Sequence, residues 1–347
     1  MVRSEIDRKE LAGRLIALPG NDPPSAMKAL LRQQKAAWPR LREGYAGLDA
    51  VESRSMTFGD VTIRIEFNPA RIVSSSAPVD DRSVRERPCF LCAANLPPEQ
   101  RGFLYGESHI MLCNPFPIFR EHFTIPHLDH TPQRIDDMFG ILLDCARDCA
   151  SGYTVLYNGP RSGASAPDHQ HFQAGEKGFL EIEREYEGLI GNGAPLTVRG
   201  AARVHAVDDG LRRWIAIGGA VKEEIAAAFS DVVRALAPET PGTGEPMMNI
   251  IAGCTGGVWT VLVFPRVRHR PSFYFAEGDA RMLISPAGTD CGGVCVTPVE
   301  KDFRRLTPEN IRTMFGEIMM SPGAFGNVCA RIARAPSARA AGAPPAQ

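Results

Sequence analysis

A run of alternating polar residues in the middle of the chain, His-Gln-His-Phe-Gln, does most to limit the folds that this sequence can adopt. In a strand, alternate side chains project from one face, so His169, His171 and Gln173 would lie together on one side. The sequence before them predicts an amphipathic helix at 133–150 and a strand at 153–158. A turn-rich loop, GPRSGASAPD, joins the two predicted strands. We therefore expect a helix, a strand, a loop and a second strand that carries the polar chemistry.

Length and composition place the chain among ordinary globular proteins. Its 347 residues are 44% hydrophobic and 23% charged, which fits about two domains or one large one. The formal net charge of -1 provides no overall field to attract nucleic acid or an anionic membrane surface. No apolar stretch approaches the ~20 residues of a membrane span, and the start lacks the apolar segment of a signal peptide. We expect a cytoplasmic protein with neither nucleic acid nor membrane as a partner.

The chain divides into four segments by its patterns. Residues 1–55 are predicted to form a helical arm, and residues 56–195 a first half that begins with a β-hairpin. Residues 196–328 are predicted to form a second half of helices and strands with few polar clusters. Residues 329–347 are rich in Ala, Pro and Arg, and we expect them to be disordered. Each half shows a helix, a turn and paired strands, as a distant duplication would.

Cysteine and histidine are concentrated in the first half. Five of the eight histidines lie between residues 122 and 171, near the only C-x-x-C of the chain, Cys89 to Cys92. Zinc accepts Cys and His together at four tetrahedral positions, and His130 and His169 are candidates for the two further ligands. An odd number of cysteines, nine, argues against a disulfide framework. Spacing alone leaves two interpretations open: a metal site that clamps separate segments together, or reduced cysteines with unrelated histidines.

The histidine pair and the loop before it are suited to a phosphate group. A neutral imidazole attacks phosphorus without first losing a proton, and it leaves again from a labile phosphoramidate. The SGAS segment supplies backbone N–H groups around Gly163, together with the hydroxyls of Ser162 and Ser165. It is not a P-loop, because it lacks the Gly-Lys-Ser/Thr ending. A Gly/Ser loop alone is usually a plain turn, so its place before the histidines is what favours an anion site.

These motifs together resemble the histidine-triad superfamily. The Ser/Gly loop before His-x-His-x-Gln, the upstream C-x-x-C and the Asn-Pro-Phe-Pro turn at 114–117 are similar to the branch of galactose-1-phosphate uridylyltransferase, diadenosine tetraphosphate phosphorylase and GDP-hexose phosphorylase. FNPARIVSSSA, RPCFLC, HFTIPHLDHTPQ and DHQHFQ resemble a bacterial group within it, described as a domain of unknown function. The resemblance is strong at about 66–175 and weaker to about 320. It implies an α+β fold of two histidine-triad-like halves, each an antiparallel sheet flanked by helices.

The resemblance also implies a role for each matching residue. His171 would be the nucleophile that accepts a nucleoside monophosphate group, and Gln173 would hydrogen-bond a nonbridging phosphate oxygen. The phosphate path would be lined by Asn158, Ser162, Gly163 and Ser165, and Arg71 would reach a phosphate. A structural zinc ion would be bound by Cys89, Cys92, His130 and His169.

The reaction that the resemblance implies is a two-step nucleotidyl transfer. The substrate would be a nucleotide sugar or a dinucleoside polyphosphate, and the acceptor inorganic phosphate or a sugar phosphate. Asp168, where Pro is usual in two of the three enzyme groups, shifts the expectation slightly toward nucleotide sugars. Hydrolysis of dinucleoside polyphosphates is one alternative, and a non-catalytic nucleotide-binding or zinc-stabilised protein is another. The base, the sugar and the choice between monomer and homodimer stay open.

Other polar residues have competing interpretations. His122 and His127 compete with His130 for the metal role, and His130 is preferred because His-Thr-Pro stands where the family's His precedes its helix. The basic run at 266–270 fits a phosphate site or a solvated surface, and Lys177 is a further candidate for a phosphate contact. Two cysteines four residues apart on the predicted helix, Cys145 and Cys149, fit buried small hydrophobic residues better than metal ligands.

Overall fold

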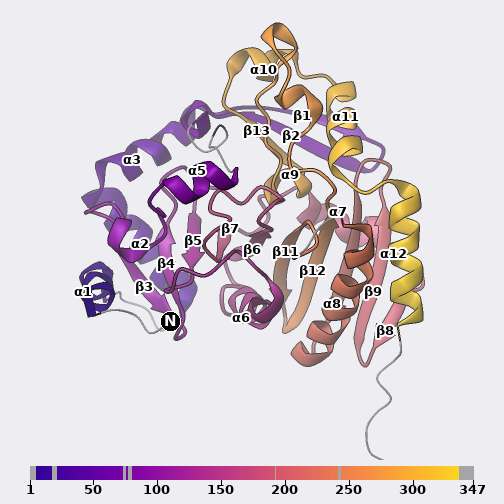
Figure 1. Cartoon of the computed structure of the whole chain (residues 1–347), viewed down its shortest axis with the longest axis horizontal. Coiled ribbons are helices and arrows are strands. Elements are labelled where there is room, and N and C mark those ends of the chain that lie inside the picture. Colours follow the sequence, from indigo (N-terminus) through magenta and orange to yellow (C-terminus); the bar gives the residue numbers. More distant parts are fainter. Residues whose placement is uncertain are drawn as a thin grey trace, which may run out of the picture.

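The computed structural model describes residues 5–17, 22–72, 76, 80–191, 193–240 and 244–335. Ten strands of this part of the chain form one antiparallel sheet, which runs from β3 on the left of Figure 1 to β8 on the right. In spatial order the strands are β3 (Gly102–Tyr105), β4 (His109–Cys113), β5 (His122–Pro126), β7 (His171–Glu176), β6 (Tyr153–Asn158), β11 (Met248–Thr255), β12 (Val258–Pro265), β10 (Arg213–Gly219), β9 (Ala202–Asp208) and β8 (Thr197–Arg199).

The large sheet consists of two halves with the same strand order. The N-terminal half contributes β3-β4-β5-β7-β6 and the C-terminal half β8-β9-β10-β12-β11, so the fifth strand of each half lies between the third and the fourth. A helix joins the third strand to the fourth in each half, α6 (Phe139–Asp148) in one and α8 (Lys222–Leu236) in the other. The two fourth strands pair antiparallel, with Asn158 opposite Asn249. The predicted α+β fold of two similar halves is confirmed, and their antiparallel sheets are joined into one.

Each face of the large sheet carries its own hydrophobic core, because the side chains of a strand alternate between faces. On one face, residues of β5, β6 and β7 pack with α6, α8, α2 (Pro23–Ala37) and α12 (Pro322–Arg334). Phe139 of α6 stacks on Phe229 of α8 with ring centroids 3.8 Å apart. Phe172 and Ala174 of β7 belong to this core. His171 and Gln173, which alternate with these two residues along β7, therefore face the opposite side of the sheet.

A three-stranded sheet packs over that opposite side. β1 (Glu52–Phe58) and β2 (Val61–Phe67) form the predicted hairpin, whose turn uses Gly59 at a φ of 62°. A strand of the C-terminal half, β13 (Val294–Thr297), runs parallel to β2. Buried residues of β2 and β13 pack with Leu156 and Ile251 of the large sheet. The hairpin of the first half is thus held by hydrogen bonds to the second half.

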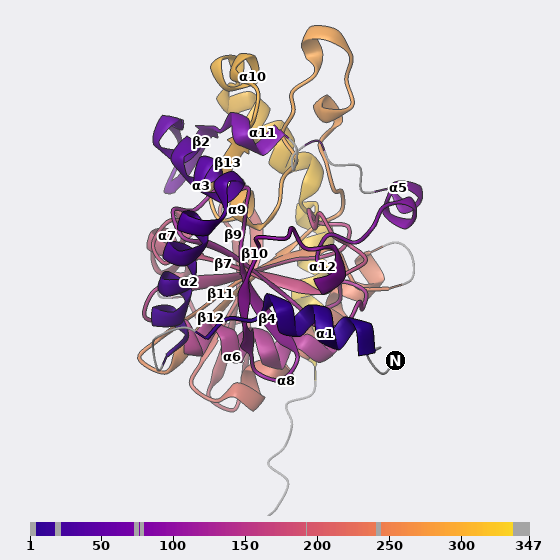
Figure 2. The ribbon, with the colours of Figure 1, turned by 90° about the vertical axis from the view of Figure 1, so that its left-hand side faces the viewer.

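The N-terminal arm consists of helices α1 (Glu5–Arg14), α2 and α3 (Pro39–Ala46), which lie on the side that faces the viewer in Figure 2. α2 begins after Asp22, whose carboxylate accepts a hydrogen bond from the backbone N–H of Ser25, a typical N-cap. The sequence predicts an arm that extends to residue 55. The structure ends it earlier, because β1 already begins at Glu52.

The C-terminal end is helical further than the sequence indicates. α12 continues to Arg334, and Val328 and Ile332 on one of its faces are fully buried in the core. The prediction of a disordered tail from residue 329 is therefore corrected for residues 329–334, since burial of this apolar face stabilises the helix. Residues 336–347 lie outside the described residues.

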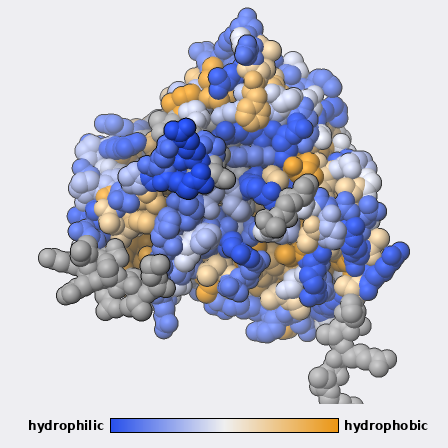
Figure 3. Space-filling view, viewed as in Figure 1, coloured by the Kyte–Doolittle hydropathy of each residue, from blue (hydrophilic) through white to orange (hydrophobic). Residues whose placement is uncertain are grey.

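The described residues contain five further α-helices. They are α5 (Asp81–Glu86), α7 (Ile182–Ile190), α9 (Gly288–Cys291), α10 (Glu300–Arg305) and α11 (Pro308–Ile318). The face of the molecule in Figure 3 is mostly hydrophilic, with apolar residues scattered over it. Within the part of the chain that the structure describes, no helix has both the length and the apolar character that a membrane span requires.

Candidate active site

A cavity of about 430 Å³ borders β6 and β7 and is lined by residues of both halves. Its lining includes four arginines, Arg40, Arg71, Arg87 and Arg270. Among the described residues that line it, there is no Asp and no Glu. Since the chain as a whole has a formal charge of -1, positive charge is concentrated in this cavity, which favours an anionic ligand.

His171 is the first residue of β7 and lines the cavity, with 4% of its surface exposed. Its Nδ1 lies 2.8 Å from the backbone oxygen of His169. A carbonyl oxygen only accepts, so Nδ1 carries the proton and Nε2 keeps its lone pair. Burial lowers the pKa of His171 to about 4, so the ring is neutral. The imidazole of His171 is thus held by a backbone carbonyl in the neutral form that attack on phosphorus needs.

A buried glutamine fixes the backbone at the point where β7 begins. Gln133, 1% exposed, accepts a 2.8 Å hydrogen bond from the His171 N–H through Oε1. Its Nε2 donates to the backbone oxygens of Asn158, at 2.8 Å, and His171, at 3.1 Å. This side chain bridges β6 and β7 and thereby sets the position of His171.

Gln173 lines the cavity two residues further along β7. Its Oε1 lies 2.9 Å from Nε2 of His122 on β5. Nδ1 of His122 accepts a hydrogen bond from the Ile118 N–H, so the His122 proton must be on Nε2, where it is donated to Gln173. Burial lowers the pKa of His122 to about 3. The carboxamide of Gln173 is therefore turned so that its oxygen faces His122, which leaves its NH2 group for the cavity.

Asn158 is the last residue of β6 and also lines the cavity. Its Oδ1 accepts hydrogen bonds of 2.8 Å from Nδ2 of Asn249 and from the backbone N–H of Gly288. With the oxygen engaged in this way, no described residue accepts a hydrogen bond from its Nδ2. Asn158 thus offers its NH2 group to the cavity, as Gln173 does.

The SGAS loop forms part of the cavity wall. Gly163 lines it at a φ of 100°, and a Cβ there would approach the Cβ of Ala287 to 2.6 Å, so only glycine fits. Ser165 also lines the cavity, and its backbone oxygen accepts a 2.8 Å hydrogen bond from Arg87. Ser162 is completely buried and is not among the lining residues. Its backbone oxygen accepts from Asn249.

Arg71 follows β2 in a short 3-10 turn, Pro69–Arg71, and lines the cavity as the sequence predicts for a phosphate contact. Its guanidinium donates a 2.6 Å hydrogen bond to the backbone oxygen of Phe116. Burial lowers the pKa of Arg71 to about 10. The side chain therefore remains a cation at neutral pH.

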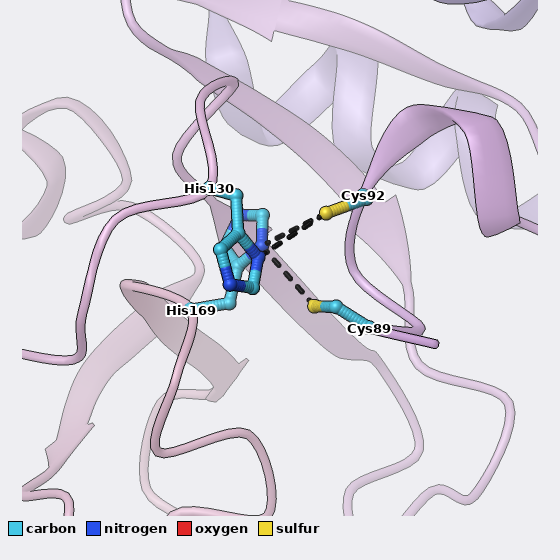
Figure 4. A group of neighbouring side chains, drawn as sticks. All are labelled: Cys89, Cys92, His130 and His169. Atoms are coloured by element: carbon cyan, nitrogen blue, oxygen red, sulfur yellow. Dashed lines mark hydrogen bonds between the residues drawn. The ribbon is translucent and has the colours of Figure 1, made fainter. Parts of the chain in front are cut away.

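Cys89, Cys92, His130 and His169 come together as one cluster, and each offers one ligand atom within 4.8 Å of the others (Figure 4). Nδ1 of His169 lies 3.3 Å from Sγ of Cys89, and Nδ1 of His130 lies 3.3 Å from Sγ of Cys92. His169 precedes β7, so its side chain points to this cluster rather than sharing a strand face with His171. The four residues could hold a metal ion.

Hydrogen bonds around the cluster favour the tautomer of His169 and the ionised form of Cys89 that bind a cation. Nε2 of His169 donates a 2.8 Å hydrogen bond to the backbone oxygen of His127, which leaves the lone pair on Nδ1. A hydrogen bond from Cys92 lowers the pKa of Cys89 to about 3, so its thiol is ionised. His122 and His127, the competitors of His130, lie outside the cluster.

The structure separates the remaining basic candidates. Lys177 does not line the cavity, because its Nζ is held by Cys254, Thr255 and Ala150. In the basic run, His269 and Arg270 line the cavity, whereas Arg268 is exposed and pairs with Glu317. Cys145 and Cys149 are completely buried in the core, as their spacing on a helix predicts.

Comparison with known proteins identifies the fold. Residues 30–176 match the model of a family described as Domain of unknown function (DUF4922). The structure of yeast Ap4A phosphorylase Apa2 in complex with AMP aligns with a TM-score of 0.56 at 15% identity, over 84% of this chain and 96% of that one. The complex of the same enzyme with Ap4A gives a TM-score of 0.52 at 15% identity, over 88% and 99%. A comparison with curated proteins finds no match. The motif-based resemblance is confirmed, and at this identity the structural likeness shows a shared fold.

Proposed function

We propose that this protein is a nucleotidyltransferase of the phosphorylase type, which transfers a nucleoside monophosphate group by way of His171. One observation carries the proposal. A neutral imidazole, with Nδ1–H bound to a carbonyl, borders a cavity whose lining has four arginines and, among the described residues, no carboxylate. Nucleophile and anion site are thus adjacent, as covalent phosphoryl-type catalysis requires.

The first step forms a bond between Nε2 of His171 and the α-phosphorus of the substrate. The bond from that phosphorus to the bridging oxygen breaks, and the leaving nucleotide or sugar phosphate departs as an anion. In the second step an oxygen of inorganic phosphate or of a sugar phosphate attacks the same phosphorus. The P–N bond breaks and the imidazole is neutral again, so no oxidant or reductant is needed.

The negative charge on the phosphoryl oxygens is met by hydrogen-bond donors that are already in place. Gln173 and Asn158 both present an NH2 group to the cavity. The backbone around Gly163 and Ser165, and the Arg71 guanidinium, supply further positive potential. Donors that need no rearrangement during the reaction are the most effective form of charge stabilisation.

A dinucleoside polyphosphate is the substrate class that we favour. The two aligned structures are described as complexes of an Ap4A phosphorylase with AMP and with Ap4A, and four arginines suit a chain of several phosphates. Nucleotide sugars are the second candidate. Asp168 is the residue that shifts the sequence-based expectation toward nucleotide sugars. Its Oδ1 lies 3.5 Å from Nη2 of Arg87 and its Oδ2 lies 3.7 Å from Nε2 of His130, so the side chain lies beside the Cys/His cluster.

We propose zinc as the metal of the Cys/His cluster, in a structural role. Zn–S and Zn–N bonds of about 2.3 Å and 2.0 Å in a tetrahedral site place sulfur and nitrogen about 3.5 Å apart. Three of the four S···N distances in the cluster lie between 3.3 and 3.6 Å. The ion would tie the Cys89 loop to the segments of His130 and His169.

Intact-protein mass spectrometry tests the reaction. Purified protein without phosphate is mixed with Ap4A and with ADP-, GDP- and UDP-hexoses, alongside His171→Ala. We expect the wild type alone to gain the mass of one nucleoside monophosphate, and phosphate to remove it. The substrate that labels the protein identifies the base.

Two other outcomes would contradict the proposal. A label that water removes as fast as phosphate does would point to a hydrolase. Binding of nucleotide with no label from any of the compounds would point to a non-catalytic nucleotide-binding protein.

A further inference from the structure

We infer that Arg266 and Asn249, both in the C-terminal half, are positioning residues that turn the carboxamide of Asn158 so that its NH2 group faces the cavity. The inference rests on the proposed function, because it concerns how the cavity holds a phosphate group. It assigns a task to the C-terminal half, whose strand β12, the counterpart of β7, has no histidine.

The arrangement begins with a buried cation. Arg266 directly follows β12 and is 0% exposed. Its Nη1 donates a 2.6 Å hydrogen bond to Oδ1 of Asn249. A guanidinium has only donors, so the atom of Asn249 that faces it must be the oxygen. The direction of the Asn249 carboxamide is thereby fixed.

Asn249 in turn orients the carboxamide of Asn158. Its Nδ2 donates to Oδ1 of Asn158 at 2.8 Å and to the backbone oxygen of Ser162 at 2.6 Å. Both hydrogens of the NH2 group are used, and Asn249 is itself 0% exposed. The contact exists because β6 and β11 pair with Asn158 directly opposite Asn249.

Asn158 is the last residue in this chain of hydrogen bonds from Arg266 and lines the cavity. A second donor, the Gly288 N–H, also meets its Oδ1 at 2.8 Å. If this carboxamide were turned over, its NH2 group would face two N–H donors, and buried donors without acceptors are strongly disfavoured. The side chain is therefore a donor toward the cavity, where a nonbridging phosphate oxygen needs one.

The same arginine also fixes the cavity wall. Its Nη2 donates to the backbone oxygens of Arg268 and His269, at 3.1 and 2.9 Å. These carbonyls immediately precede Arg270, one of the four arginines of the cavity. Removing Arg266 would disturb this wall as well as Asn249, so Arg266 is unsuitable for a clean test, and Asn249 is the better position.

Asn249→Asp separates the positioning role from a structural one. The aspartate keeps the shape of the side chain and an oxygen for Arg266, but it places a second oxygen, instead of NH2, against Asn158. The Asn158 carboxamide is then expected to turn over and present its oxygen to the cavity. Binding is measured by calorimetry with ADP and with Ap4A, in a His171→Ala background that prevents turnover. We expect Kd to rise by about 10- to 100-fold, the usual effect of losing a hydrogen bond to a charged group.

Asn158→Ala supplies the control for the added negative charge. Repulsion of phosphate by the new carboxylate would persist without Asn158, whereas an effect that acts through Asn158 would vanish. We expect Asn249→Asp to change Kd less than about 3-fold in the Asn158→Ala background, and to leave Tm close to that of the parent. An unchanged Kd in the single variant, or an undiminished loss in the Asn158→Ala background, would overturn the inference.

The outcomes also distinguish this inference from the proposed function. Binding that depends on Asn249 through Asn158, in a protein that forms no covalent label, contradicts the proposed reaction alone. A covalent label together with binding that ignores Asn249 contradicts the positioning role alone. A parent protein that binds neither ADP nor Ap4A contradicts the positioning role together with the dinucleoside polyphosphate as substrate.

Discussion

The backbone oxygen of His169 accepts a 2.8 Å hydrogen bond from Nδ1 of His171, so a residue of the Cys/His cluster sets the tautomer of the imidazole in the cavity. The side chain of His169 meanwhile lies against Cys89 and donates through Nε2 to the backbone of His127. Its position thus depends on the cluster. His169 therefore couples the Cys/His cluster to the imidazole of His171 in the cavity.

This coupling predicts that loss of the cluster slows the reaction at His171. Cys92→Ser, or removal of metal by a chelator, is expected to lower the rate of covalent labelling at least about 10-fold, because groups that support a metal site typically contribute that much. Elemental analysis should show close to one zinc ion per chain in the wild type and much less in the variant. Tm is expected to fall in parallel.

Cys329→Ser is the matched control, since this half-buried cysteine lies on α12 at the edge of the core. It should retain both metal and labelling rate. A wild-type protein that labels at full rate without metal would refute the coupling.

The hydrogen bond from His122 to Gln173 predicts a positioning role for His122. His122→Phe removes the donor that holds the oxygen of Gln173, so the carboxamide can turn its oxygen toward phosphate. We expect kcat to fall by about 10-fold or more, the loss of one charge-stabilising donor, with a smaller change in KM.

His122→Gln restores an N–H donor at the same reach and should recover part of kcat. Equal rates for the Phe and Gln variants would show that only the volume of the side chain matters. A drop in Tm without a drop in kcat would show that His122 contributes to the stability of the fold and not to catalysis.

The cavity position of Arg270 predicts that it contacts a phosphate of the substrate or of the acceptor. Its guanidinium is held by a 2.9 Å hydrogen bond to Ser285 and lies over the Tyr274 ring, 4.2 Å from the centroid. Arg270→Ala is expected to raise KM by about 10- to 100-fold, since hydrogen bonds between charged groups are strong when partly buried. The salt dependence of binding should weaken.

Arg268→Ala provides the comparison, because this exposed neighbour pairs with Glu317 on the surface. Its KM should stay within about twofold of the wild type. Equal effects at both positions would mean that general surface charge, and not a cavity contact, attracts the substrate.

A buried carboxyl predicts how stability depends on pH. Burial raises the pKa of Glu245 to about 7, although Tyr157 and the Ile135 N–H donate to it. Asp136 raises this pKa further and Arg134 lowers it. The folded state therefore keeps the Glu245 proton to a higher pH than the unfolded chain, whose value is near 4.5. The free energy of unfolding should fall as pH rises from about 4.5 to about 7, by on the order of 3 kcal/mol from this group.

Urea unfolding of the wild type and of Glu245→Gln at a series of pH values measures this contribution. The difference between the two proteins should change within that window and be constant above it. A difference that is the same at pH 5 and pH 7 would contradict the raised pKa.

Short motifs let the sequence predict most of the candidate site. The spacing of C-x-x-C and the alternation of His171 and Gln173 depend on neighbours in the chain, and the structure brings these groups to one cluster and one cavity. Gly163 was identifiable for the same reason, since its loop directly precedes the strand.

Residues whose partners are distant in sequence could not be found in this way. His122 meets Gln173 only because β5 pairs with β7, and the sequence offered it solely as a competitor for the metal. Asn249 lies in an apolar strand, MMNIIAG, and its meaning comes from a partner 91 residues away. Lys177 follows the motif closely, yet its Nζ donates to the backbone oxygens of Ala150 and Cys254 and does not line the cavity. Sheet pairing, which no local pattern specifies, decides these cases.

The joining of the two halves through β6 and β11 also determines how the molecule meets its neighbours. Unpaired strand edges invite pairing with other chains, and a half on its own would expose one beside the strand that carries His171. In the ten-stranded sheet of the described residues the outermost strands are β3 and β8, of only four and three residues. The Ile16 N–H already bonds to the oxygen of Gly102 on β3. Within the large sheet, the duplicated architecture thereby protects the longest strands, β11 and β12, from aggregation by placing them in the interior.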